Sequence, residues 1–544
     1  MLKRSLLITG VLAAVSFGQS TDLPQIWQVL DADPEILINA QGLAQHDLSI
    51  QGAGYSGSGI SINGLRLKSP YSAHLNAELP IPGNLLSAPT LGTGMQNISG
   101  HLAGTAEFNT QALEPARTVY AGLGTKEHYA GGAYAGSELA GGYIDAEKAR
   151  EIDHRGNDLE RVSGGAVLQM PHEEWTFELI TAAQSKEFGA EGYYFNGVAG
   201  AADAEQQLDD HLLFAGATRG DLDGAFIRAS ALYRDIQHQV SEPSSLLFSD
   251  VYSRNAAAMI EARTLEIQHI ALNLRGDIEY DRVSGDLSGD RTRGSVLILP
   301  EARFEHFTIK AGLNSVFQSS ESADFLPVAG IDWLVSDNAR VFFSYTETEQ
   351  QPDYQTVAAN PALQQQQSKN TELGLKQYVS ESCDWQIGSF FRTLENASDW
   401  IGGTATDLGR LHISGLDAAL RFYPTENLEL KAFYQWVYKD NDLENGLYET
   451  DYPEHLLNVS AYYRFLEEFS VQFSQTMQLQ AANTVRTGDD FGAQASLGLH
   501  YEPAYAKNVR LSLLVDNLWG SEFQSVPGLT PRPTTAFAGL AVNW

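Results

Sequence analysis

Three glycines carry the most recognisable chemical spacing in the sequence. Gly52, Gly54 and Gly57 form G-x-G-x-x-G within IQGAGYSGSGISINGLRL, residues 50–67. In dinucleotide-binding enzymes this spacing opens a helix whose N-terminus binds the pyrophosphate. Residues 60–67 instead place apolar side chains at every second position, with one break at a glycine, which is strand periodicity. The glycines therefore join one strand to another, and no nucleotide site is expected.

Other catalytic patterns are also incomplete. A G-x-S-x-G motif around Ser56 fails because Ser58 occupies the place of the last glycine. Acids, bases and nucleophiles are scattered along the chain without a local constellation. The sequence therefore predicts a protein that is not an enzyme.

Charge and cysteine content limit the partners and the stabilising bonds. The net charge of −33 argues against a nucleic-acid partner, because binding phosphate relies on Lys and Arg. The single cysteine, Cys383, cannot form a disulfide within the chain. The fold must hold together without disulfides.

The first residues have the order of a secretory signal peptide. Lys3 and Arg4 precede an apolar stretch over 5–17, and small polar residues follow up to Ser20. An N-terminal membrane anchor is the alternative, but it needs about 20 apolar residues. We expect cleavage after residue 20 and an exported mature chain. No later apolar run reaches the length of a spanning helix, which excludes a helical membrane protein.

A strand-like unit repeats along the mature chain. In residues 270–280, Leu272 and Leu274 alternate with Asn273 and Arg275, so one face is apolar and the other polar. A soluble β-sandwich would show the same alternation.

Linker lengths distinguish the two architectures. Short connections alternate with long ones along the chain. The short connections lie at 220–225, 336–340, 424–427 and 506–509, and the long ones at 189–209, 240–255, 350–369 and 439–454. Short turns at one end and long loops at the other are typical of outer-membrane barrels. About 22 such strands fit between residues 118 and 544, and the chain ends inside a strand on the aromatic Trp544. The sequence predicts an all-β fold: a large antiparallel transmembrane β-barrel.

Several segments resemble the TonB-dependent outer-membrane receptors, most closely the vitamin B12 transporter type. Residues 47–82 are similar to the core of that family's plug domain. Further similar segments follow in the family's order along the barrel: 185–195, 360–376, 407–422 and 513–528. The resemblance implies a signal peptide at 1–20, a plug domain at 21–114 and a barrel at 115–544.

The resemblance also implies a location and partners. We expect a monomer in the outer membrane of a Gram-negative-type bacterium, surrounded by outer-membrane lipid. Its C-terminal strand would be recognised by the barrel assembly machinery. The Gly52–Gly59 loop would lie at the apex of the plug, facing the outside.

Two features depart from the family pattern. Residues 21–42 resemble the middle of the plug, so the N-terminal segment that pairs with TonB is not found, and Pro24 lacks a backbone donor for such pairing. Two plug arginines are also replaced, one by Gln51 and one within the arginine-free stretch 91–104. We expect no stable TonB complex through the N-terminus and a plug that has lost its ion pairs with the barrel wall.

The resemblance places candidate ligand-binding residues at the outer mouth. They are aromatic and polar side chains of two plug loops and one outer loop: Tyr55, Ser56, Tyr71, His74, Asn76, Tyr193, Tyr194 and Phe195. In the alternative interpretation these tyrosines pack against one another or belong to the interfacial girdle. His74 is expected to be a hydrogen-bonding loop residue, because no second metal-binding side chain lies near it.

A calcium site is a second candidate. Asp440, Asp442 and Glu444 have the alternate oxygen spacing of a calcium loop, and relatives of the B12 type bind Ca²⁺ in outer loops. A solvated acidic loop would have the same composition, and no other cofactor is expected.

The predicted function is reception and transport. The barrel would bind a small, bulky nutrient, such as a cobalamin or metal chelate, at the plug apex and pass it to the periplasm. The alternative is a non-transporting surface receptor or structural, porin-like barrel that retains a vestigial plug.

Overall fold

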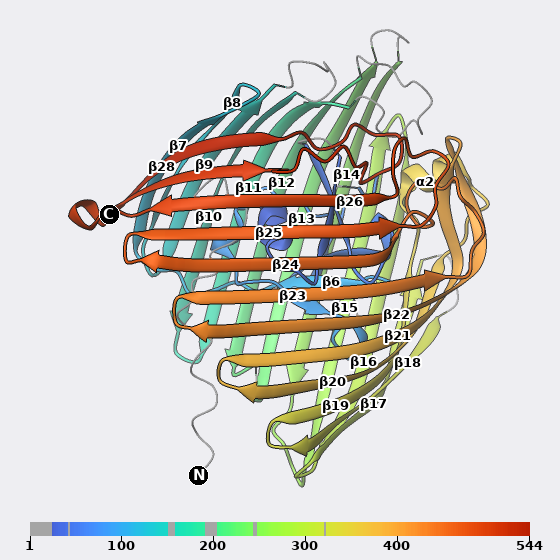
Figure 1. The fold of residues 1–544 in the computed structure, drawn as a ribbon. Helices are drawn as coiled ribbons and strands as arrows, with labels where there is room; N and C mark the ends of the chain where they lie inside the picture. Colours follow the sequence, from blue (N-terminus) through green and yellow to red (C-terminus); the bar gives the residue numbers. More distant parts are fainter. Residues whose placement is uncertain are drawn as a thin grey trace.

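In a computed structural model the chain forms a barrel that surrounds a small N-terminal domain (Figure 1). The structure describes residues 24–41, 44–74, 76–98, 100–150, 158–190, 204–222, 224–242, 247–319 and 323–544. The predicted signal peptide lies outside these residues. Within them, no helix has the length and apolar character needed to cross a membrane.

The predicted barrel is confirmed. In the described part of the chain, 22 strands pair antiparallel with their neighbours, and β28 closes the ring by pairing with β7. The strands are β7 (Ala116–Gly124), β8 (His128–Gly136), β9 (Ala140–Ala149), β10 (Leu159–His172), β11 (Trp175–Gly189), β12 (Glu205–Gly220), β13 (Phe226–Glu242), β14 (Leu247–Arg263), β15 (Ile270–Gly285), β16 (Gly289–Arg303), β17 (Phe307–Gln318), β18 (Asp324–Ser336), β19 (Ala339–Gln350), β20 (Gln366–Ser380), β21 (Cys383–Ile401), β22 (Thr404–Thr425), β23 (Leu428–Lys439), β24 (Pro453–Leu466), β25 (Phe469–Gln480), β26 (Phe491–Tyr501), β27 (Val509–Asp516) and β28 (Thr535–Asn543).

Strand β15 shows why the alternating sequence forms a barrel wall. Ile278 is 56% exposed on the outside, whereas its neighbour Glu279 is 6% exposed and faces the lumen. Leu274 also faces outward, and Arg275 reaches inward to donate to the carbonyl of Gly64, 2.8 Å away. Closure leaves no strand edge in lipid, since every strand has two partners.

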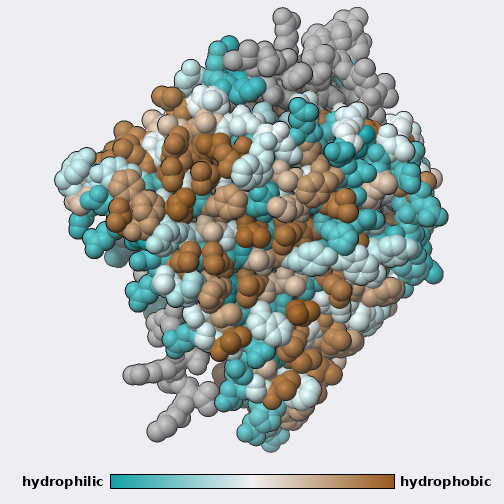
Figure 2. All heavy atoms as spheres, viewed as in Figure 1, coloured by the Kyte–Doolittle hydropathy of each residue, from teal (hydrophilic) through white to brown (hydrophobic). Residues whose placement is uncertain are grey.

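The two ends of the barrel differ. Tight turns such as 337–338 and 426–427 lie at the end that also holds the C-terminus, on the left in Figure 1. Long connections such as 440–452 and 517–534 lie at the opposite end, beside α2 (Tyr354–Ala359). In Figure 2 hydrophobic side chains gather over the strands of the visible wall, and hydrophilic ones gather at the end near α2. This is the distribution expected for a barrel with long loops outside the cell.

The N-terminal domain fills the lumen and is called the plug below. Its elements are α1 (Ile26–Asp31), β1 (Leu37–Gln41), β2 (Gln45–Ser49), η1 (Tyr55–Gly57), β3 (Ser58–Ile62), β4 (Leu65–Leu67), η2 (Gly83–Leu85), β5 (Thr90–Gly92), η3 (Gly94–Gln96) and β6 (Gly104–Phe108). A hairpin of β1 and β2 accompanies a four-stranded sheet in the order β4-β3-β6-β5. Ile60, Ile62 and Phe108 form its buried core.

The expectation that the plug has lost its ion pairs is wrong. Arg66 on β4 contacts Glu279 at 2.8 Å, and Lys68 contacts Glu279 at 2.5 Å and Asp281 at 2.9 Å. The plug carboxylate of Glu78 lies 2.5 Å from Lys186 of β11. The plug therefore has ion pairs at other positions, which replace those that the resemblance implied.

The position of the missing arginine is filled by a different arrangement. Gln51 accepts a hydrogen bond from Arg392 of β21 at 2.6 Å and donates one to Glu372 of β20 at 3.1 Å. The arginine thus lies on the barrel wall, and the plug contributes a neutral amide between two opposite charges. At this position hydrogen bonds of the uncharged Gln51 side chain hold the plug to the wall.

Candidate functional site

The glycine-rich segment forms a tight turn at the plug apex. Gln51 and Gly52 have positive φ angles of 50° and 68°. Glycine adopts such angles at little cost, and they are typical of tight turns. A Cβ atom on Gly52 would lie 3.0 Å from Val437 of the barrel, and one on Gly54 would lie 2.9 Å from Glu449. The glycines therefore allow the plug backbone to approach the wall and an outer loop, and β3 follows them as the sequence predicted.

An aromatic stack occupies the apex. The rings of Tyr55 and His74 lie parallel with centroids 3.8 Å apart, and Tyr448 of an outer loop meets both edge-on at 4.7 and 4.9 Å. Trp400 Nε1 donates to the Tyr55 hydroxyl at 3.1 Å. Tyr55 is only 8% exposed. Tyr55 therefore does not face solvent, because loop 440–452 covers it.

Two predicted ligand residues hold the plug loops in place. His74 Nδ1 lies 2.8 Å from the carboxylate of Asp47. The Asn76 side chain accepts from Leu48 N at 2.6 Å and donates to Tyr55 O at 2.6 Å and Ser58 O at 3.1 Å. His74 is thus a hydrogen-bonding loop residue, as expected, and Asn76 joins β2 to the apical turn.

A second outer loop, 351–365, docks on the plug through backbone groups. Asp353 caps α2 by accepting from Thr356 N at 2.7 Å, and it also accepts from Ala73 N at 3.3 Å. Tyr354 N and Gln355 N donate to Pro70 O and Tyr71 O at 3.0 and 2.9 Å. The loop that carries Tyr71 is therefore covered by α2.

Loop 440–452 is fixed by buried carboxylates. Asp399 accepts from Tyr448 N at 3.0 Å and from Thr450 N at 2.8 Å. Glu449 contacts Lys439 Nζ at 2.6 Å and accepts from the plug's Gly54 N at 3.0 Å. These acids hold the loop on the plug, so they are already engaged.

A small cavity, the apex cavity, remains between the plug and the two outer loops. Its lining includes Tyr55, Ser56, Thr356, Gln366, Trp400 and Tyr448. Burial raises the pKa of both tyrosines well above 10, so their phenols stay neutral and can donate hydrogen bonds. Burial also raises the pKa of Asp353. The apex cavity therefore presents phenol, indole, hydroxyl and amide groups to a ligand, together with the carboxyl groups of Asp353, Asp399 and Glu449.

The sequence found only part of this site. Tyr55 and Ser56 line the apex cavity, whereas the structure places Tyr71, His74 and Asn76 in the supporting loops. Tyr193, Tyr194 and Phe195 lie outside the described residues. Trp400 and Tyr448 were missed, because they belong to a strand end and a long loop that no spacing connects to the plug. An aromatic residue at the outer end of a strand was the one available signal.

The three predicted calcium ligands are not brought together. Asp440, Asp442 and Glu444 are all exposed, and Asp440 accepts a hydrogen bond from His412 N at 2.6 Å. Within the described ranges, no group of three or more His, Cys, Asp or Glu side chains is arranged to hold a metal ion.

Sequence comparison establishes the family. Residues 107–518 match the family described as TonB dependent receptor-like, beta-barrel. The chain belongs to this family. Its members are transporters and receptors of the outer membrane rather than enzymes, which agrees with the lipid-facing belt of the barrel. No curated protein matches the sequence.

Solved structures share the receptor's fold at low sequence identity. A variant of the FrpB iron transporter from Neisseria meningitidis superposes with a TM-score of 0.75 at 11% identity, covering 96% of this chain and 97% of that one. The copper transporter OprC gives 0.75 at 15% identity, with 97% and 96% covered. A mutant of the ferric enterobactin receptor PfeA from Pseudomonas aeruginosa gives 0.73 at 13% identity, with 96% of each chain covered. These likenesses show the fold, including the N-terminal plug, and not the ligand.

Proposed function

We propose that this receptor captures a small, bulky metal chelate at the plug apex and passes it to the periplasm. The observation that carries the proposal is the apex cavity, which the plug and two outer loops build together. A ligand there contacts both the part that must move for passage and the loops that open outward. The similar structures named for iron, copper and ferric enterobactin support a chelate, and a cobalamin is the alternative ligand.

Neutral hydrogen-bond donors favour such a ligand. Chelates present several oxygen atoms around the metal, and the phenols of Tyr55 and Tyr448 offer donors, while their rings and the indole of Trp400 offer flat apolar faces. The buried acids Asp399 and Glu449 are occupied by loop contacts, so they do not compete with the ligand for the metal.

Capture requires the outer loops to open. The apex cavity falls far below the size range of small-molecule sites, about 300–1,000 Å³, and a bulky chelate needs more room. Loops 351–365 and 440–452 must therefore move away from the plug. Such a change follows only if the ligand binds the open form more tightly than the closed form.

The second candidate function is a non-transporting barrel with a retained plug. The closed apex favours it, since Tyr55 is buried beneath Tyr448 and the plug is tied to the wall by Arg66 and Lys68. A barrel of this kind would bind no chelate and would keep its plug seated under all conditions.

Titration calorimetry of the purified receptor in detergent distinguishes the two functions. The probes are ferric enterobactin, a copper chelate and cyanocobalamin. We expect one probe to bind, and the double change Tyr55→Ala and Tyr448→Ala to weaken it by about 1–3 kcal/mol, as for other aromatic anchors. The matched control is Tyr505→Ala, which removes an exposed tyrosine at the opposite end of the barrel. No binding of any probe, or equal binding by the double variant, would contradict the proposal.

A further inference from the structure

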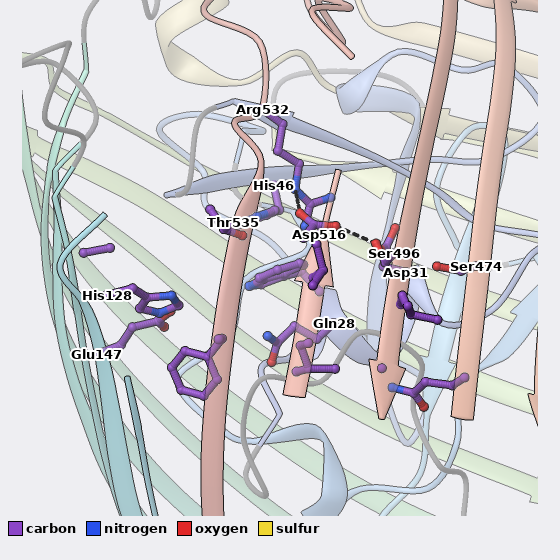
Figure 3. A pocket seen from close by; sticks show the side chains of 18 of the residues that line it. Gln28, Asp31, His46, His128, Glu147, Ser474, Ser496, Asp516, Arg532 and Thr535 are labelled. Carbon is purple, nitrogen blue, oxygen red and sulfur yellow. Dashed lines mark hydrogen bonds and ion pairs between the residues drawn. The ribbon is translucent and has the colours of Figure 1, made fainter. Parts of the chain in front are cut away.

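A second, larger cavity lies beside the plug, away from the apex. It lies between the plug segment 31–38 and the inner face of β24, β25 and β26, and we call it the lateral cavity. A neighbouring cavity lies against α1, β8 to β10 and β25 to β28. The two share Asp31, Ser474, Ser496, Asp516 and Arg532, most of which project into the space shown in Figure 3.

The lining of the lateral cavity is mostly uncharged and polar. Amides and hydroxyls predominate, from residues such as Asn458, Ser460, Ser474, Thr476, Gln478 and Gln494. Its charged groups are Asp31, Asp516 and Arg532, and the last two form an ion pair at 2.7 Å that Figure 3 shows as a dashed line. The cavity therefore has little net charge with which to attract an ion.

Several of these polar atoms have no hydrogen-bond partner within the described part of the chain. They are Asn458 Oδ1, Ser460 Oγ, Gln478 Oε1 and Gln494 Nε2 in the lateral cavity, and both amide atoms of Gln472 in the neighbouring cavity. Asn458, Ser460, Gln472 and Gln478 are all more than nine-tenths buried. Leaving such groups unpaired costs about 1–3 kcal/mol each, so a molecule that satisfies them is favoured in the cavity.

The mixture of donors and acceptors indicates the chemical class of that molecule. A hard metal cation favours several oxygen ligands, and an anion favours cationic groups and hydrogen-bond donors without facing acceptor oxygens. Gln494 Nε2 can donate, the two carbonyl oxygens can accept, and the Ser460 hydroxyl can do both. We propose that the lateral cavity is a second binding site of this receptor, which takes an uncharged, hydroxyl-bearing molecule of the polyol or sugar class.

A third cavity lies between this site and the plug apex. It shares Gly54, Tyr55 and Tyr448 with the apex cavity and Ser525 with the lateral cavity. The inference goes beyond the proposed capture at the apex, and it does not depend on which chelate binds there.

Saturation-transfer NMR on the full-length receptor in detergent micelles tests the proposal. The probe is xylitol, and sodium gluconate is the charged probe of similar size. We expect transfer of magnetisation to xylitol and none to gluconate. The double change Ser460→Ala and Gln478→Met should weaken xylitol binding about tenfold, as expected for two lost hydrogen bonds of ordinary strength. Both removed oxygens lack a partner among the described residues, so their loss breaks no bond of these atoms.

The matched control uses the opposite side of the lumen. Ser163→Ala with Gln184→Met changes a paired serine and glutamine of β10 and β11 outside the lateral cavity and should leave xylitol binding unchanged. If the double variant fails to fold, judged by its gel mobility before and after heating, Ser460→Ala alone should weaken binding about threefold. Absence of transfer to xylitol, which would mean a cavity filled by water only, overturns the proposal. Equal transfer in wild type and variant, or stronger transfer to gluconate, overturns it as well.

The result is separable from that of the chelate titration. A receptor that binds no metal chelate but transfers magnetisation to xylitol through Ser460 and Gln478 would contradict the proposed function and support the lateral site. A receptor that binds a metal chelate but transfers no magnetisation to xylitol would support the proposed function and contradict the lateral site.

Discussion

The plug meets two different walls inside the barrel. On β11 to β15, here the charged wall, Lys186, Glu279 and Asp281 form ion pairs with plug side chains. On β24 to β26, here the neutral wall, the facing groups are amides and hydroxyls such as Gln472 and Gln478. Cavities lie between these two side chains and the plug, and Asn458 donates to Pro34 O of the plug at 2.7 Å. The two walls lie about half a turn of the barrel apart in strand order.

The difference shows where the plug is anchored. A buried ion pair contributes little net stability, but removing one partner is costly because the other charge stays buried. The charged wall therefore holds the plug firmly in place, because moving the plug away from it would separate buried charges. On the neutral wall the plug can move away without separating charges, and the space for hydration already exists.

The largest expected effect comes from breaking the charged wall. Glu279→Gln removes the carboxylate that pairs with Arg66 and Lys68. We expect the plug to lose about 3–5 kcal/mol of stability, since two cations remain with fewer partners in a buried site. Hydrogen–deuterium exchange of the plug amides at increasing urea concentration measures the loss. Glu174→Gln, which breaks an exposed pair with Arg219, should cost less than about 1 kcal/mol.

The outer face of the same strands gives the next largest effect. Leu274→Arg places a charge on the lipid face of β15 and should destabilise the barrel by about 2–4 kcal/mol. Asn273→Arg points into the lumen and should be much milder. Refolding titrations in lipid vesicles measure both, and equal effects would contradict the assignment of the two faces.

Acidification should weaken the attachment of the plug to the charged wall. The effect should be smaller than those of the substitutions above, because only the contact of Glu78 with Lys186 titrates. Burial acts to raise the pKa of Glu78, but Lys186 and His46 outweigh it and lower that pKa to about 2. The Glu78 carboxylate therefore stabilises the folded plug at any pH above its ordinary pKa of about 4.5. This contribution is lost as the pH falls from about 4.5 toward 2. In the wild type the plug should be less stable at pH 3 than at pH 6. Glu78→Gln should remove this part of the difference.

The smallest expected effect is on the neutral wall. Gln472→Met removes an amide whose two polar atoms have no partner among the described residues. We expect a change within about 1 kcal/mol, of either sign, because an apolar group of similar shape replaces an unsatisfied polar one. A loss comparable to that of Glu279→Gln would show that the two walls do not differ as described.

Sequence reasoning reached the barrel but not the contacts inside it. Alternation in β15, where Ile278 and Glu279 face opposite sides, is a local signal that repeats in each strand, so the fold class and strand number were predictable. The burial of Tyr55 beneath Tyr448 depends on residues almost 400 positions apart. No local pattern encodes such a contact. For the same reason Arg66 and Lys68 were not predicted as replacements for the missing plug arginines.

Hydrogen–deuterium exchange of the intact receptor tests the two-wall account most directly. The plug has one hairpin, β3 with β4, beside the charged wall, and another, β1 with β2, whose strand β1 lies beside the neutral wall. The account predicts that the β3–β4 amides exchange at least about tenfold more slowly than those of β1–β2, and that Glu279→Gln removes most of this difference. Equal exchange of the two hairpins in wild type, or a difference that survives Glu279→Gln, would contradict it.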